Sequence, residues 1–138
     1  MESVMTAQSH TIPRTGELPV EFTGNLLAYD TSQQPKLNHW HEVAVYRTVK
    51  GSYVVHVAFR TSWKTESPSD WVTVAKSLPD VAAELLDYDP AEGVSGPPQG
   101  MLDWERRQEE VRNAAAERYD TLVSRVLAKL PGAGERIG

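Results

Sequence analysis

The sequence predicts an α+β protein, with an antiparallel sheet of three to four strands, a short packed helix and a long C-terminal helix. Three observations support this fold class. Residues 39–61 have the pattern of two strands joined by a Lys-Gly turn, and residues 20–30 and 70–75 alternate apolar with polar side chains. Residues 101–130 carry an apolar stripe with helical spacing and stop at a Pro-Gly pair.

Length and composition limit the class of protein. The 138 residues, 40% of them apolar, can form the core of one domain but not of two. The absence of cysteine excludes disulfides and thiolate chemistry. No apolar run approaches the roughly 20 residues that cross a bilayer, and the N-terminus lacks the basic-then-apolar pattern of a secretory signal. We therefore expect a cytoplasmic protein without a membrane partner.

The strands begin after a polar segment. Residues 1–18 lack periodicity and contain a proline and a glycine, so we expect a flexible N-terminal tail there. A β-meander with one helix then occupies residues 19–88. Its first strand alternates cleanly, with Leu27 as the exception. The buried face of this strand is expected to hold Val20, Phe22, Leu26 and Ala28.

The loop of the hairpin at 39–61 decides which of its side chains share a face. A two-residue Lys-Gly loop separates an apolar, aromatic face from a face with histidines and arginines. A three-residue loop, with Gly51 as a bulge, would instead place Tyr46 beside His56 and Trp40 beside Arg60. We favour the two-residue loop because it segregates the apolar side chains. Its apolar face would hold Trp40, Ala44, Tyr46, Tyr53, Val55, Val57 and Phe59.

The polar face of the hairpin is the basic part of an acidic protein. Residues 31–65 hold five basic residues and one acidic residue, which gives +4 within a chain of net charge −5. Such a surface could bind the phosphates of a nucleic acid, or it could pair with the acidic residues of 66–100. The candidate surface consists of His41, Arg47, His56 and Arg60.

A short helix and a linker follow the strand at 70–75. Ser77 and Asp80 have the spacing of a capping box, with a proline in the first turn, and the helix is expected to end near Asp87. The Pro- and Gly-rich segment 89–100 reads as a linker.

The last expected element is a long helix at 101–131, followed by a tail at 132–138. A helix of about 45 Å is longer than a small sheet can cover. It could bend near Asn113, or it could pack against the same helix of a second chain. We favour the second possibility and therefore a homodimer or another protein partner. The candidate helix interface consists of Val111, Leu122, Val126 and Leu130.

No motif indicates catalysis, a metal or a cofactor. His39 and His41 have the spacing of two metal ligands on one strand, but His56 lies too far from them in the favoured register to complete a site. The chain has no nucleophile elbow, phosphate loop or dinucleotide fingerprint. An enzyme or small-ligand domain would need a pocket between the sheet and the long helix. Its candidate residues are Trp40, Tyr46 and Trp104.

Two segments carry a family resemblance. Residues 22–28 (FTGNLLA) and 45–56 (VYRTVKGSYVVH) resemble the C-terminal domain of the EXLDI proteins. These are small bacterial chains in which that domain often follows a ribbon-helix-helix-like DNA-binding segment. The resemblance covers residues 20–60, and this chain lacks both the naming motif and the DNA-binding part. It implies a regulatory or accessory role and transfers no functional residue.

These observations leave three hypotheses for function. The leading one is a non-catalytic protein-interaction or regulatory accessory module. The alternatives are a nucleic-acid-binding accessory protein that uses the basic hairpin face, and a small-ligand-binding domain or enzyme.

Overall fold

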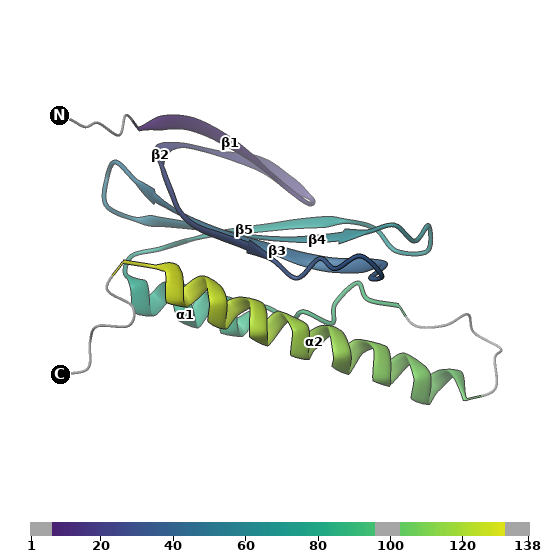
Figure 1. The fold of residues 1–138 in the computed structure, drawn as a ribbon. Helices are drawn as coiled ribbons and strands as arrows, with labels where there is room; N and C mark the ends of the chain where they lie inside the picture. The colour runs from purple at the N-terminus through teal and green to yellow at the C-terminus, as the bar shows by residue number, and fades with distance from the viewer. Residues whose placement is uncertain (1–6, 96–102, 132–138) are drawn as a thin grey trace, which may run out of the picture.

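Five strands precede two helices in a computed structural model, which describes residues 7–95 and 103–131 (Figure 1). The elements are β1 (Gln8–Arg14), β2 (Glu17–Thr31), β3 (His39–Thr48), β4 (Tyr53–Thr61), β5 (Ser69–Ala75), α1 (Leu78–Asp87) and α2 (Trp104–Lys129). The strands form one antiparallel sheet in chain order. The α+β class is confirmed, but the expected three to four strands are too few.

The additional strand, β1, lies in the segment that we expected to be a flexible tail. Of its side chains only that of Ile12 is buried, so the apolar alternation that marks a strand is missing. Pro13 falls where the pairing of β1 with β2 is irregular, a position at which a strand tolerates the loss of an N–H donor.

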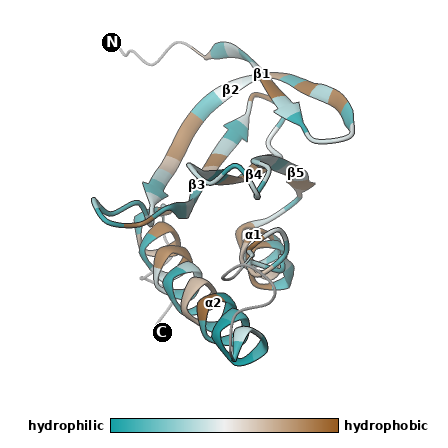
Figure 2. Cartoon of the chain, turned by 90° about the vertical axis from the view of Figure 1, so that its right-hand side faces the viewer, coloured by the Kyte–Doolittle hydropathy of each residue, from teal (hydrophilic) through white to brown (hydrophobic). Residues whose placement is uncertain are grey.

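The sheet is curled into a half-barrel, in which β2 changes its pairing partner along its length. Its first part pairs with β1 and its second part with β3, and Gly24 is partnered on both sides, by Gln8 and Thr48. The β1–β2 hairpin folds over the face of the sheet that is turned away from the helices (Figure 2). At its tip, Thr15 N–H donates to the carbonyl of Asp70 at 2.9 Å, so β1 reaches the far edge strand β5. We call this face of the sheet, which the β1–β2 hairpin partly covers, the inner face.

A β-bulge in β2 explains why Leu27 breaks the alternation. Leu26 is paired with Tyr46 but Ala28 with Val45, which leaves Leu27 as the extra residue. Leu26 therefore lies on the inner face, whereas Ala28 belongs to the core between the sheet and the helices. The expectation that these two side chains share a face is wrong, because a one-residue insertion exchanges the two faces of a strand.

The β3–β4 hairpin has a three-residue loop. Thr48 N–H donates to the carbonyl of Ser52 at 2.9 Å, and Gly51 has a φ of +93°. A positive φ at the last loop position is typical of a three-residue hairpin loop with a bulge, and glycine adopts it without strain.

The favoured two-residue register is therefore wrong, and the alternative describes the hairpin. Trp40 is paired with Arg60, as that alternative requires. His56 lies on the same face as Tyr46 but is opposite Ala44, while Tyr46 is opposite Val54. The prediction failed because β3 carries apolar residues on both faces, so either face could be buried. The helix side of β3 and β4 holds His41, Val43, Val45, Arg47, Tyr53, Val55, Val57 and Phe59.

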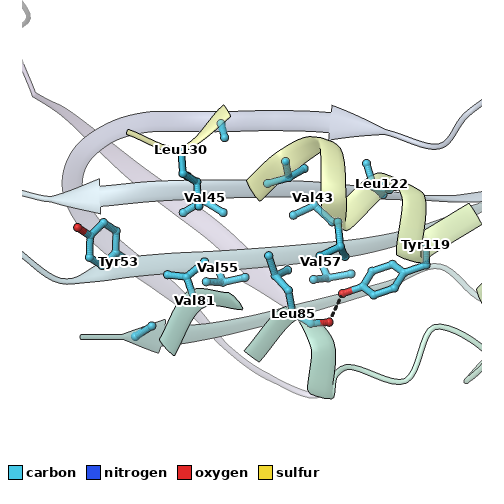
Figure 3. Close-up of a cluster of buried hydrophobic side chains, with 14 residues drawn as sticks. Val43, Val45, Tyr53, Val55, Val57, Val81, Leu85, Tyr119, Leu122 and Leu130 are labelled. Carbon is cyan, nitrogen blue, oxygen red and sulfur yellow. Dashed lines mark hydrogen bonds between the residues drawn. The ribbon is translucent and has the colours of Figure 1, made fainter. Parts of the chain in front are cut away.

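The main core lies between the sheet and the two helices. α2 runs beneath β2 and β3, and α1 beneath β4 and β5 (Figure 2). Tyr119 of α2 donates its hydroxyl hydrogen to the carbonyl of Leu85 in α1 at 2.7 Å (Figure 3), which joins the helices inside the core. The centre of this core consists of Val43, Val45, Val55, Val57, Val81, Leu85, Tyr119, Leu122 and Val126. Each large side chain buried there contributes roughly 1.5–3 kcal/mol to folding.

The two helices follow the local signals of the sequence. The Ser77 hydroxyl accepts from Asp80 N–H at 3.2 Å, which confirms the expected cap of α1. α2 is unbroken through Asn113. Of the expected linker, residues 89–95 are described and contain a turn at 90–93, while its remainder and the expected tail at 132–138 lie outside the described residues.

Candidate functional site

An apolar groove opens at one end of the main core. Its volume is about 690 Å³, within the roughly 300–1,000 Å³ of small-molecule sites. The turn between β3 and β4, the start of α1 and the end of α2 form its walls. Its apolar lining consists of Tyr53, Leu78, Pro79, Ala82, Leu127, Leu130 and Pro131. In Figure 3, Tyr53 and Leu130 mark this end of the core, and Tyr119 lies at the opposite end.

Two basic side chains, Arg47 and Lys76, also line this apolar groove. Arg47 lies on the helix side of β3 and donates to the Tyr53 hydroxyl at 3.2 Å, with its guanidinium carbon 5.3 Å from the centre of the Tyr53 ring. Lys76 precedes the cap residue Ser77, so it stands beside the N-terminus of α1. The described lining residues include no Asp or Glu. The groove therefore combines an apolar floor with positive charge.

The predicted helix interface is part of the chain's own core. Leu122 and Val126 are fully buried, Leu130 is 4% exposed, and Val111 packs against the cluster around Phe59. The expectation that this stripe is free for a second chain is corrected, because the sheet already covers it.

The predicted basic face is divided between the two sides of the sheet. His41 is buried between the sheet and the helices, and Arg47 reaches the groove. His56 and Arg60 lie on the inner face. The register error separates these residues, so the four do not form one surface.

The predicted pocket is also not assembled. Trp40 and Tyr46 lie on the inner face, away from both helices, whereas Trp104 begins α2 and borders a shallow hollow with Ala91 and Gln108.

The inner face has a polar node beside a small apolar cluster. His56 Nε2 and Arg60 Nη2 lie 2.7 and 2.8 Å from Oδ1 of Asp70. Burial alone would raise the pKa of Asp70, but these hydrogen bonds and charges hold it below its usual value. The backbone N–H of Asp70 donates to the Thr15 hydroxyl at 2.7 Å, so the node also fastens the β1–β2 hairpin. The node therefore joins β4, β5 and the β1–β2 hairpin through side-chain hydrogen bonds.

A second polar network surrounds Glu66, whose side chain has no exposed surface. One carboxylate oxygen accepts from the Thr61 hydroxyl at 2.6 Å, and the other accepts from Ser95 N–H at 2.7 Å. His39 Nδ1 lies 3.2 Å from this carboxylate. The network ties the β4–β5 loop to the segment after α1, and its acceptors are used within the protein.

Metal ligation is not indicated by these side chains. Within residues 7–95 and 103–131, no three His, Cys, Asp or Glu side chains gather in a way that could hold an ion. None of the helices described is long and apolar enough to cross a membrane.

Comparison with known proteins adds no relative. No family model, curated protein or solved structure matches the chain. The EXLDI resemblance stays a prediction, and no residue role is transferred from another protein.

The sequence pointed to Arg47 but not to the groove. The lining comes from the hairpin, the α1 cap and the end of α2, which are far apart in the chain. Ala82 and Leu127 belong to the apolar stripes by which any amphipathic helix packs on its own core. Lys76 lies in the connection between β5 and α1, where a single basic residue carries no signal. Only the register of the hairpin and the position of α2 bring these residues together.

Proposed function

We propose that this chain is a non-catalytic binding module that takes an apolar ligand in the groove. The observation that carries the proposal is the groove itself, with a volume of about 690 Å³ and a predominantly apolar lining. Small-molecule sites are commonly largely preformed, apolar and furnished with a few polar groups.

The floor of the groove supports a preformed site. Tyr53 and Leu130 line it but are only 7% and 4% exposed, because the rest of each side chain packs in the main core. A ligand would therefore meet side chains that are already held in place, and binding would cost little ordering of the protein.

Binding rather than catalysis fits the polar groups of the lining. The described lining residues include no His, Asp, Glu or Cys, which are the commonest general acids, bases and thiol nucleophiles. Tyr and Lys can also take such roles, but the Tyr53 hydroxyl already accepts a hydrogen bond from Arg47, and Lys76 has no carboxylate or histidine beside it among the described lining residues. The Ser77 hydroxyl is engaged by Asp80 N–H in the helix cap.

A substitution that fills the groove tests the proposal. Ala82 lines the groove from α1, and Ala82→Phe would place a ring in the space that a ligand needs. We expect titration of the full chain with 1-octanol to shift amide NMR signals of groove residues in the wild type. In Ala82→Phe this binding should weaken by roughly tenfold or more, since the alkyl tail of the bound 1-octanol would lose about 1.4 kcal/mol or more of apolar contact.

The neighbouring Ala83 provides a matched control. It is exposed and does not line the groove, so Ala83→Phe adds the same ring to α1 on a different face. This variant should bind 1-octanol as the wild type does. Unchanged wild-type groove signals, or equal binding by both variants, would contradict the proposal.

A further inference from the structure

We infer that the groove selects a carboxylate on an apolar tail, with the tail on the core wall and the carboxylate at Arg47 and Lys76. This inference rests on the proposed function and specifies the chemistry of its ligand. Its first support is the charge of the lining. The chain has 19 acidic and 14 basic residues, yet the charged residues described in the groove are both cations.

The second support is that no carboxylate among the described residues neutralises either cation of the groove. Neither has an acidic partner within 4.0 Å among residues 7–95 and 103–131. Of the other eleven Lys and Arg residues that the structure describes, five are paired with carboxylates, and the remaining six, like the two at the groove, are not. The unpaired state alone is therefore common, and what distinguishes Arg47 and Lys76 is their place in an apolar lining. Within residues 7–95 and 103–131, no carboxylate therefore competes with an incoming anion for these two charges.

Arg47 is oriented without being neutralised. Its Nη1 donates to the Tyr53 hydroxyl, which is an uncharged acceptor, and this contact fixes the guanidinium at the wall of the groove. A guanidinium has five N–H donors in a planar fork, so others remain for a carboxylate. Tyr53 itself belongs to the apolar floor, and the cation therefore stands beside the surface that would hold the tail.

The helix ends at the groove have opposite effects that nearly cancel. Ser77, Leu78 and Pro79 form the start of α1, whose dipole attracts an anion. Leu127 and Leu130 belong to the end of α2, whose dipole repels one. Each end is equivalent to about half an elementary charge, so the two full charges of Arg47 and Lys76 decide the sign.

Three probes with linear tails of seven or eight carbons and different head groups test the inference on the full chain. Octanoate, 1-octanol and octyltrimethylammonium present similar tails with negative, neutral and positive heads. We expect octanoate to bind about tenfold more tightly than 1-octanol at low ionic strength, because two charge-assisted contacts are added. Octyltrimethylammonium should bind most weakly, and added salt should reduce the preference for octanoate.

Removal of the two charges should abolish the selectivity but keep the groove. In Arg47→Gln/Lys76→Gln, octanoate and 1-octanol should bind with equal affinity, within about twofold. Lys64→Gln removes one charge from the loop between β4 and β5, at the other end of the sheet, and should retain the preference. Each single groove variant should show an intermediate preference, which keeps the test available if the double variant does not fold.

The outcomes separate the two proposals. If 1-octanol shifts the groove signals but octanoate binds no better, the groove binds apolar ligands and the carboxylate inference is wrong. A preference for octanoate that survives in the double variant also refutes it. If none of the probes shifts groove signals in the wild type, the proposed function itself fails.

Discussion

At the scale of single residues, His41 is buried in a position that suits only a neutral imidazole. Its ring lies 5.3–5.9 Å from the rings of Phe59, Tyr88 and Tyr119, and its Nε2 has no hydrogen-bond partner in the described structure. Burial, assisted by His39 and Arg118, lowers the pKa of His41 from 6.5 to about 4.

This environment predicts an acid-sensitive fold. The pKa of His41 is lower in the folded protein than in the unfolded chain, so acid favours unfolding as the pH falls from 6.5 to about 4. The loss should approach about 3 kcal/mol and should be absent above about pH 7. Urea unfolding across this range should show that His41→Phe, which keeps a ring among the aromatic neighbours, loses less stability than the wild type. Acid also weakens folding through carboxylates such as Asp30, and this loss is common to both proteins. Burial alone would raise the pKa of Asp30, but its hydrogen bonds to Thr31, Lys129 and Arg125 lower it to about 2. Parallel pH profiles would refute the assignment to His41.

At the scale of elements, β2 approaches β3 closely at Gly24, the residue at which β2 passes from its pairing with β1 to its pairing with β3. A Cβ there would lie 2.2 Å from the carbonyl oxygen of Arg47 and 2.9 Å from the Cα of Thr48, both of which are backbone atoms. The two strands could admit a methyl group only by separating.

Gly24→Ala should therefore destabilise the protein by about 3 kcal/mol, at the upper end of the usual cost of overpacking. Hydrogen exchange should locate the loss in β1 and the first part of β2. The adjacent Thr23 is exposed, and Thr23→Ala should change the free energy of unfolding by less than about 1 kcal/mol. Equal stability of the two variants would show that the strands separate easily at this point.

What could be predicted from the sequence depends on how local the determining contacts are. The cap of α1 was predicted correctly because Ser77 and Asp80 interact within one turn. The faces of β3 were exchanged because the loop geometry at Gly51 decides between two apolar faces. β1 was missed because Ile12 is its one buried side chain and is covered by distant residues, Val54 and Val72. The groove was missed for the same reason.

At the scale of the whole molecule, the sheet uses both of its faces within one chain. The helices cover one face, and the β1–β2 hairpin covers part of the other through Ile12, Val20 and Phe22. The long helix therefore completes the fold of its own chain, in contrast to the expectation of an interface with a second copy.

A charged substitution in the helix stripe distinguishes these two roles. Leu122 has no exposed surface and packs in the main core. In Leu122→Asp a carboxylate would be buried without a partner, at a cost of several kcal/mol, which is comparable to the whole stability of a small domain. We expect circular dichroism to show an unfolded chain. Leu86 of α1 is 67% exposed, and Leu86→Asp should remain folded with little change in stability. A folded, monomeric Leu122→Asp together with a dimeric wild type in light scattering would mean that the stripe joins two chains, and that the packing of α2 on its own sheet is not the state in solution.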